Sequence, residues 1–257
     1  MKERHSPRVK KIAKIAAGSR GFGLPEILIS LFLSSFILLA LVNQYLGIKK
    51  EHQQIEAWLG QNTEVQLLID LMRDSVRRAG FTPCLTIPHL LTSDVQGKPL
   101  FSLAIKHKPA TMLIINRMHE EFDEISAISD SNQVRTKTRI LKAGQTILIA
   151  DCYHAETSVV KSIKAIGNGQ IVDLMNPLIF NYQQPAYIGE WLEEKYFIRK
   201  VKNQNALYYG RNRFDELAPF VDDLAVQLLR KKDNILVRII LDLNHGKNIQ
   251  FDTKLRA

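Results

Sequence analysis

GFGLPE at residues 21–26 joins a basic leader to a long apolar run and decides how the chain begins to fold. The run that follows, residues 27–48, contains no charged side chain and measures about 33 Å as a helix at roughly 1.5 Å per residue. That length is enough to cross a bilayer core of about 30 Å. Glu26 stands at the mouth of this run, where an ionisable group is costly without a partner and therefore indicates function.

The leader, residues 1–21, differs from an ordinary secretory signal in the order of its parts. It carries seven Lys and Arg residues against one acid, and the positive-inside bias places such a segment on the cytoplasmic side of a membrane. An ordinary signal has an apolar stretch of about 7–15 residues followed by a small-residue cleavage site. Here the apolar run is longer, no such site follows it, and the small residue Gly21 precedes it.

The pattern Gly-Phe-x-x-x-Glu ahead of a long apolar run resembles the prepilin signal of type IV pilins and pseudopilins. The resemblance implies cleavage between Gly21 and Phe22 by a prepilin peptidase at the cytoplasmic face, and N-methylation of Phe22 by the same enzyme. It also implies that Glu26, fifth in the mature chain, neutralises the terminal amine of a neighbouring subunit in a filament core. An ammonium and a carboxylate are each expensive in hydrocarbon, and pairing offsets much of that cost. The alternative is a signal anchor with a chance Gly-Phe.

The formal charge of +9 overstates how basic the mature chain is. Seven bases and one acid in residues 1–21 account for six of those charges and leave +3 on the remainder. A strongly basic mature chain would have suggested a nucleic-acid partner, but a charge of +3 largely removes that argument. DNA binding therefore stays a possibility without support from the sequence. Nothing in the chain repeats at a fixed period, and the size of the remainder suits one domain on a stem.

Beyond the apolar run, residues 49–80 predict an amphipathic continuation of the same helix. Apolar side chains recur there at three- and four-residue spacings from Ile55 to Val76. Gly80 fits a left-handed helix cap, and the Thr-Pro pair that follows forbids continuation. We therefore expect one helix over residues 22–79. The expected organisation is a leader at residues 1–21, a transmembrane or filament-core helix at 22–48, its amphipathic continuation at 49–80, and a periplasmic head at 81–257.

The head is predicted to be rich in β-structure, because short β-branched and aromatic runs alternate with Gly, Pro and Asn breakers. Residues 218–231 fit either a strand or a short helix, and the acidic and polar stretch 120–137 is predicted to be an exposed loop. The fold class is therefore α+β, pilin-like, with a long N-terminal helix packed on a mostly antiparallel sheet. Strands are expected at residues 100–105, 111–116, 146–150, 159–166, 170–174, 196–201, 206–209 and 235–241.

Cys84 and Cys152 are the two cysteines of the chain, and an even count outside the cytoplasm invites pairing. A disulfide would pin the junction between helix and sheet and close a loop of about 68 residues, worth roughly 4 kcal/mol by chain entropy. Two alternatives stay open at this point: free buried thiols, and a metal site or Cys/His nucleophile at residues 151–154. No second Cys-His cluster supports the spacing of a zinc site.

Several head segments sharpen the family resemblance. RRAGF at residues 77–81, with Cys84, is similar to the signature of PilW-like minor pilins, and IADC at residues 149–152 is similar to their second cysteine segment. By texture the chain also resembles the J-type pseudopilin of type II secretion. Pro83, where the family often has Gly, and the long leader depart from the pattern. Residues 195–198, 207–209 and 216–217 with 221–224 resemble the C-terminal strands of these minor pilins.

These features predict a structural subunit and not an enzyme. No phosphate loop, nucleophile elbow, dinucleotide fingerprint or zincin spacing occurs, so we expect no catalytic residue, metal or cofactor. The resemblance implies a single-pass inner-membrane minor pilin, with its head in the periplasm, that takes part in type IV pilus assembly and so in adhesion, motility or DNA uptake. It implies partners among minor pilins, the major pilin, the prepilin peptidase and the inner-membrane assembly platform. The alternatives are a secretion pseudopilin and a pilus-borne adhesin or DNA-binding module.

Overall fold

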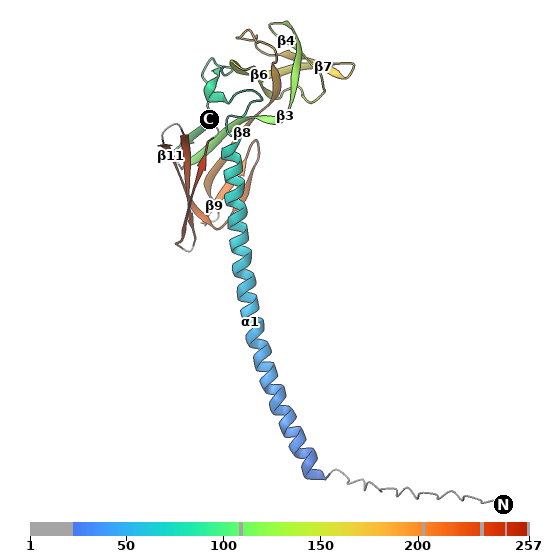
Figure 1. Cartoon of the computed structure of the whole chain (residues 1–257), viewed down its shortest axis with the longest axis vertical. Helices are drawn as coiled ribbons and strands as arrows, with labels where there is room; N and C mark the ends of the chain where they lie inside the picture. The colour runs from blue at the N-terminus through green and yellow to red at the C-terminus, as the bar shows by residue number, and fades with distance from the viewer. Residues whose placement is uncertain (1–22, 108–109, 202–203, 232–233, 245, 256–257) are drawn as a thin grey trace, which may run out of the picture. The chain divides into compact units, whose positions relative to one another are not determined.

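A computed structural model describes residues 23–107, 110–201, 204–231, 234–244 and 246–255, with the backbone alone for residues 54–61, 231 and 234. The chain divides into two units, Met1–Asn62 and Thr63–Ala257. The long helix α1 (Leu24–Arg77) begins in the first unit and ends in the second, which also holds the β-structure (Figure 1). The last four turns of α1 therefore belong to the head and not to the stem.

The end of α1 agrees with the helix stop predicted from the sequence, two residues early. Gly80 follows it with φ of +73°, a conformation that L side chains rarely adopt. A Cβ added at Gly80 would lie 2.7 Å from the Cβ of Ser102, so the chain also passes too close to this neighbour for any larger residue. The buried positions of α1 follow the predicted three- and four-residue spacing: they are Leu68, Ile69, Met72, Ser75 and Val76.

Each of the eight predicted strands overlaps an observed one, and the ambiguous stretch 218–231 forms a strand. A short 3-10 turn, η1 (Ile87–His89), precedes the first strand. The described strands are β1 (Leu91–Ser93), β2 (Leu103–Lys106), β3 (Met112–Asp130), β4 (Gln133–Thr136), β5 (Thr146–Ala150), β6 (His154–Ile166), β7 (Gly169–Leu174), β8 (Tyr187–Val201), β9 (Gln204–Gly210), β10 (Phe214–Ala218), β11 (Val221–Lys231), β12 (Asn234–Leu243) and β13 (Asn248–Lys254).

The exposed loop predicted at residues 120–137 is wrong, because this stretch forms the second half of β3, a turn and β4. Ile125 and Val134 are fully buried within it, while most of the neighbouring charged side chains are exposed. Asp123 is buried as well and accepts hydrogen bonds from the backbone N–H and the hydroxyl of Thr138, at 2.5 and 2.9 Å. The prediction failed because the many acidic residues of this stretch suggested a loop, although the strand buries one of its faces.

Six strands form a closed antiparallel barrel. β3 pairs with β8, β8 with β5, β5 with β6, β6 with β7, β7 with β4, and β4 returns to β3. In Figure 1, β4, β6 and β7 lie together at one end of the head. Gly189 of β8 faces the bulge in β3, where a Cβ would lie 2.9 Å from Cγ of Met118. The aliphatic side chains that fill the barrel include Ile125, Val134, Ile147, Ile149, Val160, Val172, Leu174 and Ile188.

A second core lies between the end of α1 and two sheets. One sheet contains β2, the first half of β3, β8, β9 and β10, and the other is β11-β12-β13. Met72 and Val76 of α1 share one apolar cluster with Tyr196 of β8 and Phe251 of β13. The fold is therefore α+β, with a helix packed on antiparallel sheet as predicted.

Candidate functional site: the apolar helix, its carboxylate and the head junction

Glu26 lies in the first turn of α1 with an exposed side chain. Its Oε2 accepts a hydrogen bond from the backbone N–H of Gly23 at 3.3 Å, a local contact typical of an acid at a helix N-terminus. Within the described residues this is the one partner that the structure records for the carboxylate. Gly21 and Phe22, the expected cleavage and methylation positions, lie outside the described residues. The carboxylate is thus presented at the start of the helix without a cation from the described part of its own chain.

The apolar part of α1 exposes its side chains all round. Residues 24–53 form a helix long and apolar enough to cross a membrane, and none of its most apolar stretch is buried within the described structure. The exposed fractions run from 47% for Ile27 to 76% for Leu24, and Phe32 and Phe36 are exposed to 70% and 65%. Apolar side chains are stable when they are removed from water. This surface therefore requires lipid or other helices to cover it.

Three serines interrupt the apolar surface without leaving an unpaired hydroxyl. Ser30, Ser34 and Ser35 each donate to the backbone carbonyl three residues earlier, at 2.9, 2.9 and 2.8 Å. In hydrocarbon a polar group without a partner is expensive, and these internal bonds avoid that cost. The hydroxyls of these three serines are thus compatible with an apolar surrounding.

Cys84 and Cys152 are joined by a disulfide, with their Cα atoms 5.2 Å apart. The bond ties the loop after Gly80 to the turn between β5 and β6, as expected from the sequence. It also removes the alternatives of free thiols or of a Cys/His nucleophile at residues 151–154. Asp151 shapes that turn, since its Oδ1 accepts the backbone N–H groups of Tyr153 and His154 at 2.7 and 2.6 Å.

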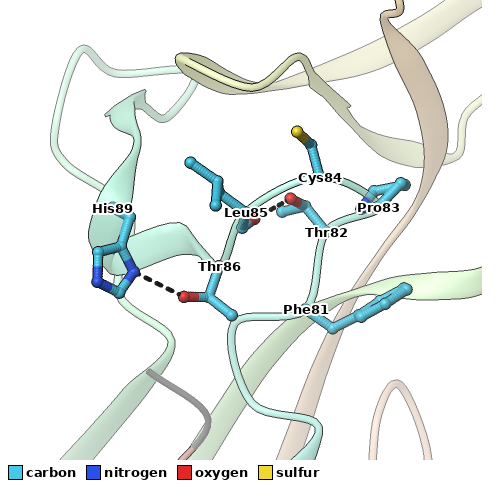
Figure 2. Close-up of a pocket in the computed structure, with 7 residues that line it drawn as sticks. All are labelled: Phe81, Thr82, Pro83, Cys84, Leu85, Thr86 and His89. Atoms are coloured by element: carbon cyan, nitrogen blue, oxygen red, sulfur yellow. Dashed lines mark hydrogen bonds between the residues drawn. The ribbon is translucent and has the colours of Figure 1, made fainter.

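The loop that carries Cys84 curls around a small hollow of about 380 Å³ (Figure 2). Two side-chain contacts shape it: Thr82 donates to the carbonyl of Leu85, and the Thr86 hydroxyl lies 3.0 Å from Nδ1 of His89. Residues 81–86 and His89 line the hollow. These two contacts are local to the loop. The disulfide connects the loop to the barrel, together with the hydrogen bond that the backbone N–H of Met118 in β3 donates to the carbonyl of Phe81, at 2.9 Å. The arrangement is that of a fixed junction between helix and barrel.

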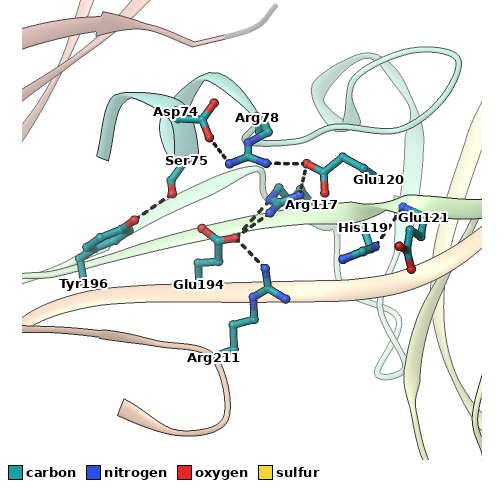
Figure 3. Close-up of polar contacts among 10 residues, drawn as sticks. All are labelled: Asp74, Ser75, Arg78, Arg117, His119, Glu120, Glu121, Glu194, Tyr196 and Arg211. Atoms are coloured by element: carbon teal, nitrogen blue, oxygen red, sulfur yellow. Dashed lines mark hydrogen bonds and ion pairs between the residues drawn. The ribbon is translucent and has the colours of Figure 1, made fainter. Parts of the chain in front are cut away.

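A buried ion pair joins β3 to β8 next to the end of α1 (Figure 3). Arg117 and Glu194 are exposed to only 3% and 2% at their side chains, and Nη2 of Arg117 lies 2.8 Å from Oε1 of Glu194. Nε of Arg117 donates to the same oxygen at 3.3 Å, and Arg211 approaches it at 3.5 Å. The other oxygen, Oε2, is buried and has no partner in the structure. The pair is therefore highly sensitive to the loss of either member.

The pair extends to the last turns of α1 through Glu120 and Arg78 (Figure 3). Oε1 of Glu120 lies 2.5 Å from Nη1 of Arg117 and 3.0 Å from Nη1 of Arg78, which also contacts Asp74. Partial burial opposes ionisation of Glu120, but hydrogen bonds from Arg117 and Arg78 outweigh it and lower its pKa to about 2. These charges connect the helix end to the sheet.

A neutral hydrogen bond completes the junction. The hydroxyls of Ser75 and Tyr196 lie 2.8 Å apart in the core, and burial raises the pKa of Tyr196. Arg117, Glu194 and Tyr196 were not predicted from the sequence to act at this junction. Its signal was available, because Arg117 and Glu194 stand at inward positions of alternating strands, two residues from Ile115 and Tyr196. A charge at such a position predicts a buried partner.

Within the described ranges no group of three or more His, Cys, Asp or Glu side chains is placed to hold a metal ion. Oδ2 of Asp151 and Nδ1 of His154 lie 3.4 Å apart, but the Asp151 carboxylate already accepts hydrogen bonds from backbone N–H groups. Burial opposes ionisation of Asp151, but these hydrogen bonds outweigh it and lower the pKa of the carboxyl group. Comparison of the chain with protein-family models, curated proteins and solved structures finds no match.

Proposed function

We propose that this chain is a minor pilin, a subunit held in the inner membrane by α1 before it enters the priming or tip complex of a type IV pilus. One observation carries the proposal: an apolar helix, exposed on all sides, begins at a carboxylate that has no cationic partner in the described residues. Lipid covers such a surface before assembly, and neighbouring helices cover it afterwards. A filament core is a surrounding in which the carboxylate also gains a partner.

The partner for Glu26 is the terminal ammonium of a neighbouring subunit, created by cleavage after Gly21. Local bonding does not satisfy this carboxylate, because the one hydrogen bond from Gly23 is long at 3.3 Å and leaves Oε1 free within the described residues. Removal of one member of a desolvated ion pair leaves the other charge unpaired, at a cost of roughly 3–5 kcal/mol. The pair therefore favours assembly without contributing to the fold of the head.

The junction between α1 and the head supports the same role. The Ser75–Tyr196 contact fixes the last turns of α1 to the sheet, and the disulfide ties the loop after Gly80 to the barrel. The Arg117–Glu194 pair joins β3 to β8 and reaches Asp74 of α1 through Glu120 and Arg78. A subunit that is placed in a filament by its helix must hold its head rigidly on that helix. Fixed attachment at this point is what such a subunit needs.

The test is the variant Glu26→Gln, compared with Glu51→Gln as a matched control on the same helix. Glu51 is exposed and lies beyond the apolar run, so its loss changes the net charge equally without touching the start of the helix. We expect Glu26→Gln to insert, mature and fold its head normally, while recovery of other pilins from detergent-solubilised membranes falls by tenfold or more, about 1.4 kcal/mol. Glu51→Gln should recover partners as the wild type does.

Two results would contradict the proposal. Equal recovery of partners with wild type and Glu26→Gln would show that the charge does not recruit this subunit. Equal losses with both variants would show a nonspecific effect of charge. The identity of the recovered partners also separates a pilus from the alternative secretion machine, because one yields pilins and the other yields pseudopilins with their secretion components.

A further inference from the structure

The free edge of β13 is the outer side of the sheet β11-β12-β13. β13 pairs with β12 in regular register, from Asn248 opposite Asp242 to Lys254 opposite Leu236. Two backbone hydrogen bonds flank this ladder: the N–H of Leu243 donates to the carbonyl of Lys247, and the N–H of Leu255 donates to the carbonyl of Ile235. They show which residues of β13 exchange hydrogen bonds with β12. Antiparallel pairs alternate, so odd-numbered residues of β13 bond to β12 and even-numbered residues face away.

The outward residues of β13 are Asn248, Gln250, Asp252 and Lys254. All four are exposed, while the alternate residues Phe251 and Thr253 are buried at 5% and 3%. In the described part of the chain no backbone partner is recorded for the N–H and C=O groups of these four residues. Over seven residues, about 24 Å at roughly 3.4 Å each, β13 thus presents an open row of hydrogen-bonding groups.

The other sheet margins of the described head differ from β13, although β11 also pairs regularly with β12 from Asp223 to Lys231. β1, β2 and β10 have three, four and five residues, and β10 also carries a register shift. β11 has a bulge at its start, and Asn205 of β9 donates to the carbonyl of Asp222 there, at 3.0 Å. Natural sheets protect their edges by short strands, charged side chains, bulges, Pro or covering segments, and Asp252 and Lys254 are the charges on this edge. β13 has no Pro or bulge, and its outward residues are uncovered.

We propose that the edge of β13 takes an extended segment of a partner polypeptide as a fourth strand. Main-chain hydrogen bonds supply affinity in this mode, and alternate side chains supply selectivity. Asp252 holds Arg238 of β12 at 2.8 and 2.9 Å, and Lys254 lies two residues further along the same face. The matching strand therefore carries an acidic residue opposite Lys254, and a basic residue opposite Asp252 shares that carboxylate with Arg238. Its inward residues are apolar, because they continue the row of Phe251.

This inference does not depend on the proposed pilin function, and its first test needs no partner. In the full chain in detergent micelles, amide hydrogen exchange should be fast at Gln250 and Asp252 and slow at Phe251 and Thr253. The expected ratio is at least about 100-fold, since ladder amides exchange only on opening of the strand. Slow exchange at all four amides would mean that the edge is already covered, and it would overturn the proposal.

The second test supplies a strand. The probe EVKVTVT is appended after Ala257 through a flexible Gly/Ser linker, which gives an effective concentration in the millimolar range. In an antiparallel arrangement its Glu lies opposite Lys254 and its Lys opposite Asp252. Exchange at the Gln250 and Asp252 amides should slow by about tenfold or more, equal to 1.4 kcal/mol. The control probe EVKVPVT keeps both charges but has Pro opposite Gln250, and it should give little slowing.

The same two tethered chains test whether the edge is used in the cell. The chain capped by EVKVTVT should lose at least one protein that both the wild type and the EVKVPVT chain retain from solubilised membranes. Failure of the tethered probe to slow exchange, or equal slowing by both probes, would overturn the edge as a strand acceptor. Full retention of all partners by the capped chain would overturn its use in binding. None of these outcomes depends on Glu26, so they are separable from the test of the pilin proposal.

Discussion

Replacement of Arg117 by Met should destabilise the head more than any surface change, because it strips Glu194 of its main partner. The side chain of Glu194 is exposed to only 2%, and Arg117 donates to it at 2.8 and 3.3 Å. After the substitution Arg211, at 3.5 Å, is the remaining cation in reach among the described residues. Breaking a buried pair in this way costs about 3–5 kcal/mol. For a unit of this size that corresponds to a fall in Tm of roughly 6–20 °C.

The assay is thermal and urea unfolding of the full chain in detergent micelles, followed by a probe of β-structure. The control is Arg238→Met, which removes an exposed pair with Asp252 and should cost less than about 1 kcal/mol. The double variant Arg117→Met with Glu194→Leu should recover at least half of the loss, since a matched apolar pair leaves no buried charge. A loss below about 1 kcal/mol for Arg117→Met, or no recovery in the double variant, would refute the reasoning.

Three further predictions concern the head. Loss of both Cys84 and Cys152 to Ser should lower the free energy of unfolding by about 4 kcal/mol, because the bond closes a 68-residue separation; unchanged urea midpoints would contradict it. Burial raises the pKa of Glu156, so the folded chain favours the neutral carboxyl group and loses stability as pH rises and this group ionises. The Glu156→Gln variant should therefore be more stable than the wild type at pH 8, and the difference should become smaller at acidic pH. Glu120, with its pKa lowered to about 2 from 4.5, stabilises the chain above pH 4.5; the contribution should vanish as pH falls toward 2, and the Glu120→Gln difference should vanish with it.

The stem and most strands could be predicted because their signals are local. The sequence indicates α1 directly through the charge-free run ahead of residue 49 and the spacing of Leu68, Met72 and Val76. Gly80 indicates where the helix ends. Short runs rich in Ile, Val and Leu indicate β5, β7 and β12 in the same way. The disulfide was predictable from the cysteine count and the expected compartment.

The barrel and the charged junction could not be derived from local patterns. Closure of the barrel depends on β3 and β6 changing partners halfway, which a one-dimensional pattern does not encode. The acids around Ile125 concealed the second half of β3. The partner of Arg117 is Glu194, 77 residues away, and alternation predicts only that some partner exists. β13 was missed because its outward face is entirely polar, which weakens the apolar signal of the strand.

The most direct test of the central claim is the mass of the N-terminal peptide of the mature protein, isolated from cells that contain a prepilin peptidase. We predict a chain that begins with N-methylated Phe22, since cleavage after Gly21 creates the ammonium with which Glu26 of a neighbour pairs. Gly21→Leu should block this cleavage, because a bulky side chain hinders access to the backbone, and should retain residues 1–21. An intact leader beginning at Met1 in the wild-type protein would contradict the account.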